Sequence, residues 1–157
     1  MPVSPTGIVA DRERALGKEL FNHVWTLLET EHRSRAQDDE MIHAAHASRF
    51  HWGRCGGPVE LCRGEWQVSR VYSVLGRGEP AIHHARRCLD LCEENGITGF
   101  DHAIAYEALA RAHAVSGDLQ RAGAHARRAR DLRSAIADEE DRRIFDGDMA
   151  TLPSGLL

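Results

Sequence analysis

The chain resembles itself when it is shifted by 41 residues. Ten of the 22 positions in segment 70–91 are identical to their counterparts in segment 111–132. The identities pair Arg70, Val74, Gly76, Ala81, His84, Ala85, Arg86, Arg87, Asp90 and Leu91 with Arg111, Val115, Gly117, Ala122, His125, Ala126, Arg127, Arg128, Asp131 and Leu132. A period between about 20 and 50 residues is typical of stacked supersecondary units that share one core. The repeat therefore predicts an array of similar units.

The residue pattern indicates that these units are helical. Ala, Leu, Arg and Glu are frequent, and no segment alternates β-branched and polar residues. Proline near helix starts and glycine near helix ends divide the chain into expected helices at about 11–31, 38–52, 59–75, 79–95, 101–116, 118–137 and 138–146. The apolar face of the first helix, which we expect to be buried, consists of Leu16, Leu20, Phe21, Val24, Leu27 and Leu28.

These helices predict an all-α, single-domain protein. The domain is expected over 11–148, with hairpins at about 11–54, 58–95 and 101–137 and a short last helix at 138–146. A flexible N-terminus, 1–10, and a C-terminal tail, 149–157, are expected to flank it.

Charge and cysteine content narrow the classes of partner. The 157 residues carry a net charge of −4, so the chain lacks the basic footprint of a protein that binds duplex DNA or an anionic membrane. The N-terminal segment lacks the apolar run of a secretion signal, and the four cysteines form no Cys-x-x-Cys pair. We therefore expect a cytoplasmic protein with free thiols.

Each repeat places small residues at fixed distances after a glycine. Ala81 and Ala85 follow Gly76 with the same spacing as Ala122 and Ala126 follow Gly117. This pattern resembles the tetratricopeptide repeat (TPR) family, whose hairpins stack as a right-handed superhelix. The period is longer than the family's usual ~34 residues. No proline closes either repeat, and His113 occupies a usually aromatic position.

The TPR resemblance implies a concave groove lined by the first helix of each hairpin. Arg63, Trp66, Arg70, Glu107 and Arg111 are the residues expected there. Arg70 and Arg111 occupy equivalent positions, and two guanidinium groups beside an indole could clamp the carboxylate of a peptide or small acid. Alternatively, Glu107 and Arg111 form an ordinary i,i+4 surface pair. We expect a non-catalytic module that binds a protein, peptide or small acidic ligand, and whose short stack favours a homodimer.

A second hypothesis is a metal-dependent enzyme. Asp39, His43 and His46 fall on one face of the second expected helix, where they could hold a divalent transition metal. The alternative is that this face packs against the first helix. No nucleophile or phosphate-loop motif is present in the sequence.

Two further groups have both a functional and a structural interpretation. His84, Cys88 and Cys92 could bind zinc with Cys55 or Cys62, or the cysteines could be small core residues. The second group is a basic cluster that consists of Arg86, Arg87, Arg121, Arg127, Arg128, Arg130 and Arg133. It could contact RNA or an acidic protein, although such a run of charge is more often a solvated face.

Overall fold

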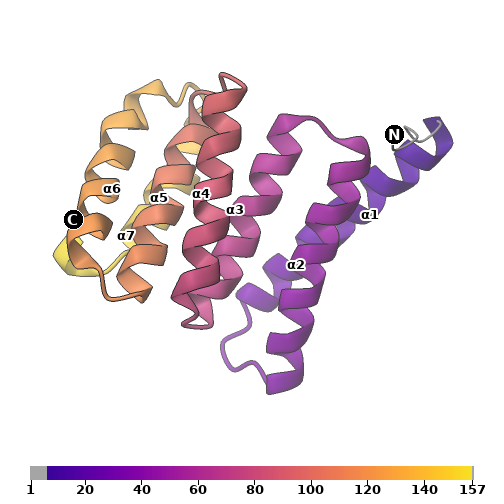
Figure 1. The fold of residues 1–157 in the computed structure, drawn as a ribbon, viewed down its shortest axis with the longest axis horizontal. Coiled ribbons are helices and arrows are strands. Elements are labelled where there is room, and N and C mark those ends of the chain that lie inside the picture. The colour runs from indigo at the N-terminus through magenta and orange to yellow at the C-terminus, as the bar shows by residue number, and fades with distance from the viewer. Residues whose placement is uncertain (1–6, 157) are drawn as a thin grey trace.

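The computed structural model describes residues 7–156, which form seven α-helices and two short 3-10 helices without any strand (Figure 1). The α-helices are α1 (Gly7–Leu28), α2 (Arg35–Cys55), α3 (Pro58–Val74), α4 (Gly78–Glu94), α5 (Phe100–Val115), α6 (Leu119–Leu132) and α7 (Glu139–Ala150). The 3-10 helices are η1 (Arg133–Ala135) and η2 (Ser154–Leu156). The all-α prediction is confirmed.

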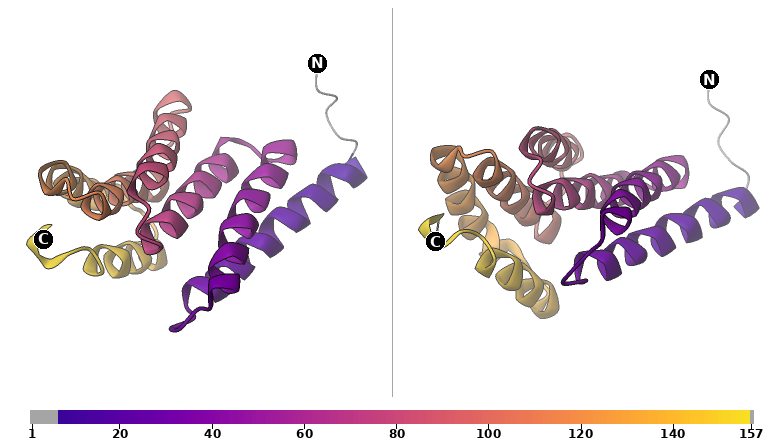
Figure 2. Two further views of the ribbon diagram at one scale, coloured as in Figure 1. Left: turned by 60° about the horizontal axis from the view of Figure 1, so that its bottom comes forward. Right: turned by 90° about the horizontal axis from the view of Figure 1, so that it is seen from below.

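Adjacent helices pack pairwise. The most extensive contacts join α1 with α2, α3 with α4 and α5 with α6, as expected for three antiparallel hairpins (Figure 1). The hairpins contact one another through α2 and α3 and through α4 and α5, and α3 also touches α5. The last helix, α7, turns back and packs on α5 (Figure 2).

The 41-residue period reappears in the helix boundaries. Shifting the last residue of α3, Val74, by 41 positions gives the last residue of α5, Val115. Gly76 and Gly117 follow these helices with φ angles of 73° and 84°, a left-handed conformation that glycine adopts without strain. In both turns the residue after the glycine, Arg77 or Asp118, donates its backbone N–H to the carbonyl five positions earlier in the chain. The two helix ends are therefore closed by the same hydrogen bond.

Small residues lie where the helices cross. Ala81, Ala85, Ala122 and Ala126 are all fully buried. In the first hairpin the same role falls to Gly17, whose backbone carbonyl accepts a 2.7 Å hydrogen bond from the Ser48 hydroxyl. These residues let paired helix backbones approach closely.

Several expected boundaries need correction. The first helix begins at Gly7 rather than near 11, so 7–10 are helical, while 1–6 lie outside the described residues. The second begins at Arg35, because Ser34 and Gln37 form a capping box. Leu16, expected on the buried face of the first helix, is 43% exposed.

The C-terminal region is more ordered than expected. The last helix continues from Glu139 to Ala150 instead of ending near 146. Met149, Leu152 and Leu156 are buried, so the segment expected as a tail packs on the domain as far as it is described. The expected sixth helix ends at Leu132 and gives way to η1.

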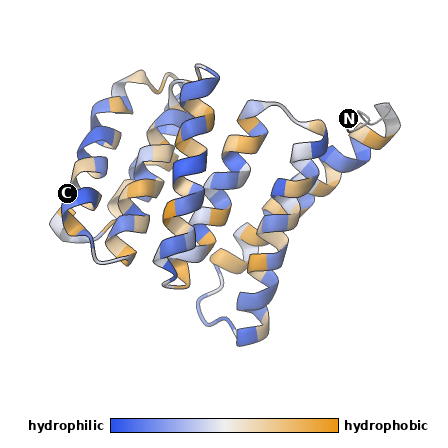
Figure 3. Ribbon diagram, viewed as in Figure 1, coloured by the Kyte–Doolittle hydropathy of each residue, from blue (hydrophilic) through white to orange (hydrophobic). Residues whose placement is uncertain are grey.

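Hydrophilic and hydrophobic residues are interspersed along the helices that face the viewer in Figure 3. Within residues 7–156, no helix combines the length and apolar character required to span a bilayer.

Candidate functional site

The five residues expected in a groove share one face of α3 and α5. Trp66 and Glu107 are equivalent under the 41-residue shift, as are Arg70 and Arg111. The last helix, α7, packs on α5 and reaches α3 through the ion pair of Arg70 with Asp148 (Figure 2). It therefore covers the part of this face around Glu107 and Arg111, whereas Arg63 and Trp66 line a pocket beside it.

Glu107 is at the centre of a charge cluster between these helices. Its side chain is 1% exposed, and its Oε1 lies 2.5 Å from Nη2 of Arg111 and 3.5 Å from Nη1 of Arg70. Nη2 of Arg70 lies 3.4 Å from Oδ1 of Asp148 on α7. Two guanidinium groups and two carboxylates thus balance, so the cluster offers little net charge to an acidic ligand.

Arg111 also holds α7 in place. Its Nη2 donates to the backbone carbonyl of Asp148 at 2.9 Å and to the Thr151 hydroxyl at 2.7 Å. Phe145 and Met149 bury the apolar side of the same helix. The pair of arginines expected to clamp a ligand is instead engaged with Glu107 and α7.

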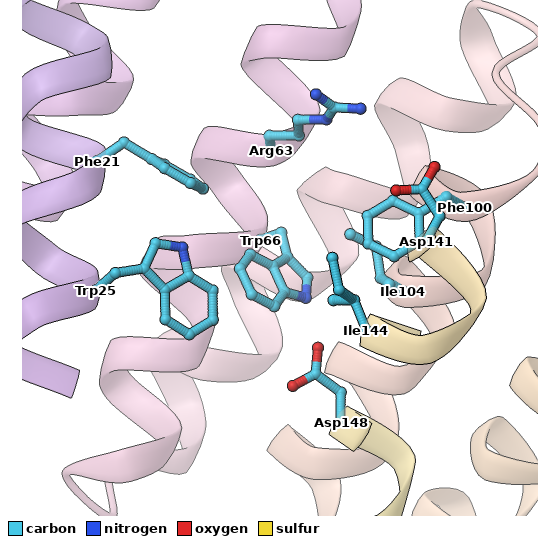
Figure 4. Close-up of a pocket in the computed structure, with 9 residues that line it drawn as sticks. All are labelled: Phe21, Trp25, Arg63, Trp66, Phe100, Ile104, Asp141, Ile144 and Asp148. Carbon is cyan, nitrogen blue, oxygen red and sulfur yellow. The ribbon is translucent and has the colours of Figure 1, made fainter. Parts of the chain in front are cut away.

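A pocket remains beside this cluster, between the first hairpin and α7 (Figure 4). Its volume is about 230 Å³. The wall is mainly aromatic and aliphatic, with side chains from α1, α3, α5 and α7: Phe21, Trp25, Arg63, Trp66, Phe100, Ile104, Asp141, Ile144 and Asp148. A small apolar concavity with a few polar groups is the usual form of a binding site.

Two polar atoms at this pocket are unsatisfied. Nε1 of Trp66 and Oδ2 of Asp148 are buried and have no hydrogen-bond partner among the described residues. Burial raises the pKa of Asp148, and the nearby Glu107 charge adds to this effect, while Arg70 opposes it. One donor and one acceptor thus lie buried beside an otherwise apolar site without partners among the described residues.

Arg63 contributes less positive charge to the pocket than the sequence suggests. Its Nε and Nη2 donate to the two carboxylate oxygens of Asp101 at 2.8 and 3.2 Å. With Arg63 paired with Asp101 and Asp148 paired with Arg70, Asp141 is the charged side chain of the pocket that forms no ion pair within residues 7–156.

The structure does not assemble the expected metal site on α2. Asp39, His43 and His46 are exposed, and they are not among the groups of three ligand atoms that lie within 4.8 Å of one another in the described chain. Nε2 of His46 lies 2.9 Å from the Tyr72 hydroxyl instead. The contact with Tyr72 and its neighbours partly removes the His46 imidazole from water, and this desolvation lowers its pKa; the charge of His84 lowers the pKa further.

His84 joins a polar network rather than the cysteines. Its Nδ1 lies 2.6 Å from Oε2 of Glu65, whose Oε1 accepts a 3.0 Å hydrogen bond from Arg49. Cys55 is also separate, with its thiol 3.5 Å from the His51 carbonyl. The thiols that do meet are those of Cys62, Cys88 and Cys92.

The expected basic cluster is divided among local contacts. Arg121 pairs with Asp118, and Arg133 forms two 2.6 Å hydrogen bonds with Asp146. Arg128 lies over the Tyr106 ring, and Arg130 donates to the Leu156 carbonyl. These contacts favour the interpretation as a solvated, locally paired surface.

Of the residues that line this pocket, the sequence predicted only Arg63 and Trp66 as site residues. Phe21 and Trp25 lie four residues apart on α1, which is the available signal that both face the same side. Ile144 and Asp148 have the same spacing on α7, but their approach to α3 depends on how the chain turns back after η1.

Comparison with known proteins finds no matching family model, and no curated protein or solved structure is significantly similar to the chain. The function is therefore inferred from the site's geometry.

Proposed function

We propose that this protein is a non-catalytic, TPR-like binding module whose pocket holds one large apolar side chain of a peptide or protein partner. The repeat class is supported by the shared 41-residue offset, by the paired turns at Gly76 and Gly117, and by the contact between α3 and α5. The binding role is supported by the aromatic pocket and its two unsatisfied polar atoms.

The pocket's size favours an anchoring side chain. Its volume of about 230 Å³ is below the range of about 300–1,000 Å³ that is common for drug-sized ligands. A single buried aromatic or aliphatic anchor often supplies much of the affinity of a peptide or protein interface.

Peptide chemistry also fits the polar atoms. Once the lining side chains shift to uncover these two buried atoms, a peptide carbonyl can accept from Nε1 of Trp66, and a peptide N–H can donate to Oδ2 of Asp148. The charge of Asp141, which no described arginine pairs with, makes a carboxylate ligand a poorer match than a neutral amide. A metal-dependent enzyme is the weaker proposal, because Asp39, His43 and His46 are not grouped within the described chain.

The test is an NMR titration with N-acetyl-tryptophanamide, N-acetyl-leucinamide and N-acetyl-glycinamide, which carry the same two backbone amide groups and differ only in the side chain. We expect the two large probes to shift the Trp66 indole N–H signal with a Kd of about 1 mM, or about −4 kcal/mol, and the glycine probe to shift it far less. Trp52 lies outside the pocket and serves as an internal reference.

A substitution that fills the pocket provides the control. Ile144 lines the pocket and is 47% exposed, so Ile144→Trp should obstruct it without disturbing the core. Leu119→Trp makes the same kind of change on α6, away from this pocket. Loss of the shift in Ile144→Trp alone would support the proposal, whereas equal shifts in both variants, or none in the native chain, would contradict it.

A further inference from the structure

Three of the four cysteines meet at one point of the α3–α4 hairpin. The Sγ atom of Cys62 on α3 lies 3.3 Å from that of Cys88 and 3.2 Å from that of Cys92, both on α4. All three sulfurs lie within 4.8 Å of one another, and all three residues are 0% exposed. The i,i+4 spacing of Cys88 and Cys92 places both thiols toward Cys62.

The helical packing does not require cysteine at two of these three positions. Under the 41-residue shift, Cys62 corresponds to Ala103 and Cys88 to Ala129. Both alanines are also 0% exposed, at the same crossing of the next hairpin, α5–α6. Alanine is therefore sufficient to fill this crossing, and the sulfur atoms provide chemistry that packing alone does not need.

The sulfur positions match a metal-binding site. A cation bound to each sulfur at about 2.3 Å holds the sulfurs about 3.8 to 4.0 Å apart, within about 1 Å of the arrangement present. Each thiol would bind the metal as thiolate, the form of cysteine that ligates metal ions. No fourth His, Cys, Asp or Glu joins the three within residues 7–156.

We propose that Cys62, Cys88 and Cys92 form a buried site for a soft, thiophilic cation, and that Cu(I) is the metal it fits. Soft thiolate ligands favour Cu(I), which three sulfurs can coordinate completely. Structural Zn²⁺ usually requires four ligands, and the burial of the site disfavours water as the fourth. Binding involves no redox step, since the copper is Cu(I) both before and after it binds. Each thiol that coordinates as thiolate releases its proton to solvent.

The experiment is an anaerobic titration of the full chain with Cu(I) against a chromophoric Cu(I) chelator, with a phosphine as reductant. Because the site is buried, a parallel sample is refolded in the presence of Cu(I) so that slow entry does not hide binding. We expect one Cu(I) per chain and a higher unfolding temperature for the loaded protein. Zn²⁺ in equal amount should not displace it.

Two variants copy the neighbouring repeat. Cys62→Ala and Cys88→Ala reproduce Ala103 and Ala129, so both should keep the fold, which circular dichroism and urea unfolding would verify. Removal of a residue that only orients a ligand from the outer shell typically costs about 10–100-fold in metal affinity. Loss of a direct ligand should cost more, so we expect each variant to bind Cu(I) at least about 100-fold more weakly than the native chain. Cys55→Ala is the matched control and should bind as the native chain does.

Two results would overturn the site, and a third would overturn the choice of metal. One is the absence of Cu(I) binding by the reduced native chain even after refolding with the metal. The other is equal Cu(I) affinity in Cys62→Ala and the native chain, which would place the metal elsewhere. Preferential binding of Zn²⁺ over Cu(I) would contradict the choice of metal.

Discussion

Arg111 on α5 donates from one nitrogen, Nη2, to the backbone carbonyl of Asp148 on α7 at 2.9 Å. The same nitrogen contacts Glu107, which is almost fully buried. Since Arg111 occupies a repeat position on the groove-lining face, this contact places the chain's own last helix where the TPR resemblance would place a ligand. The pocket that remains lies at the edge of α7 rather than along the whole groove.

Replacement of Arg111 should strongly destabilise the protein. Arg111→Ala removes the contacts to Glu107, Asp148 and Thr151 and leaves the buried Glu107 carboxylate with Arg70 alone. Breaking one partner of a buried ion pair costs about 3–5 kcal/mol, so we expect a fall of this size in the free energy of unfolding. Urea denaturation measures it.

Arg143 on α7 provides the comparison. It pairs with Glu139, and both side chains are about three-quarters exposed, so Arg143→Ala should change the free energy of unfolding by less than about 0.5 kcal/mol. Equal effects of the two substitutions would show that the Arg111 cluster does not hold α7.

Two glycines should respond in opposite directions to alanine. A Cβ on Gly17 would lie 2.2 Å from Cδ1 of Trp52, whereas a Cβ on Gly147 of α7 meets no described atom within 4 Å. We expect Gly17→Ala to lower the free energy of unfolding by about 1–3 kcal/mol through overpacking. Gly147→Ala should raise it by about 0.5–1 kcal/mol through helix propensity. Thermal and urea unfolding of both variants measure the difference, and a stabilising Gly17→Ala would disprove the close crossing.

Glu65 should make stability dependent on acid pH. Burial raises the pKa of Glu65, but the hydrogen bond and charge of His84, together with Arg49, outweigh burial and hold the pKa below its ordinary value of 4.5. A carboxyl whose pKa is lower in the folded state contributes stability above its unfolded pKa, and this contribution disappears as the pH falls through the folded pKa.

Glu65→Gln isolates this contribution. We expect it to lower the free energy of unfolding by about 1–3 kcal/mol at pH 7, because the contacts to His84 and Arg49 weaken. Urea unfolding from pH 7 to pH 3 should show this difference shrinking once Glu65 is protonated in the native chain. A difference that stays constant over this interval would contradict the ionic role of Glu65.

The stacked pair His113 and His125 should produce a second pH dependence. Burial lowers the pKa of both imidazoles, and the charge of His113 lowers that of His125 further. The unfolded chain therefore binds protons first, so stability falls as the pH drops below about 6.5. His113→Tyr copies Tyr72, which stacks on His84 in the equivalent pair. We expect this variant to lose less stability between pH 7.5 and 5.5, measured by urea unfolding; an unchanged slope would exclude the pair as its source.

The helical hairpins could be predicted because their signals are local. Gly76 and Gly117 end helices through their own backbone conformation, and the alanines at the crossings follow at fixed spacing. The position of α7 could not be predicted in this way. Its docking depends on Arg70 and Arg111 reaching Asp148, about 78 and 37 positions away in sequence, and neither partner has an unusual local pattern.

The candidate site was predictable only in part for the same reason. Trp66 and Arg63 follow from the TPR resemblance, but the pocket also needs Trp25 from the first helix and Ile144 from the last. The cysteine cluster shows the same limit. The spacing of Cys88 and Cys92 is local, whereas the choice of Cys62 over Cys55 is made by the packing of α3 on α4.

Selection of peptides from a random library most directly tests the central claim, that recognition takes place in the aromatic pocket beside α7. The native chain would be the target, with Ile144→Trp for counter-selection and Leu119→Trp as the matched control. The expected result is a set of peptides that share one large apolar anchor and bind the native chain and Leu119→Trp but not Ile144→Trp. Enrichment of acidic peptides that bind Ile144→Trp as tightly as the native chain would contradict the claim.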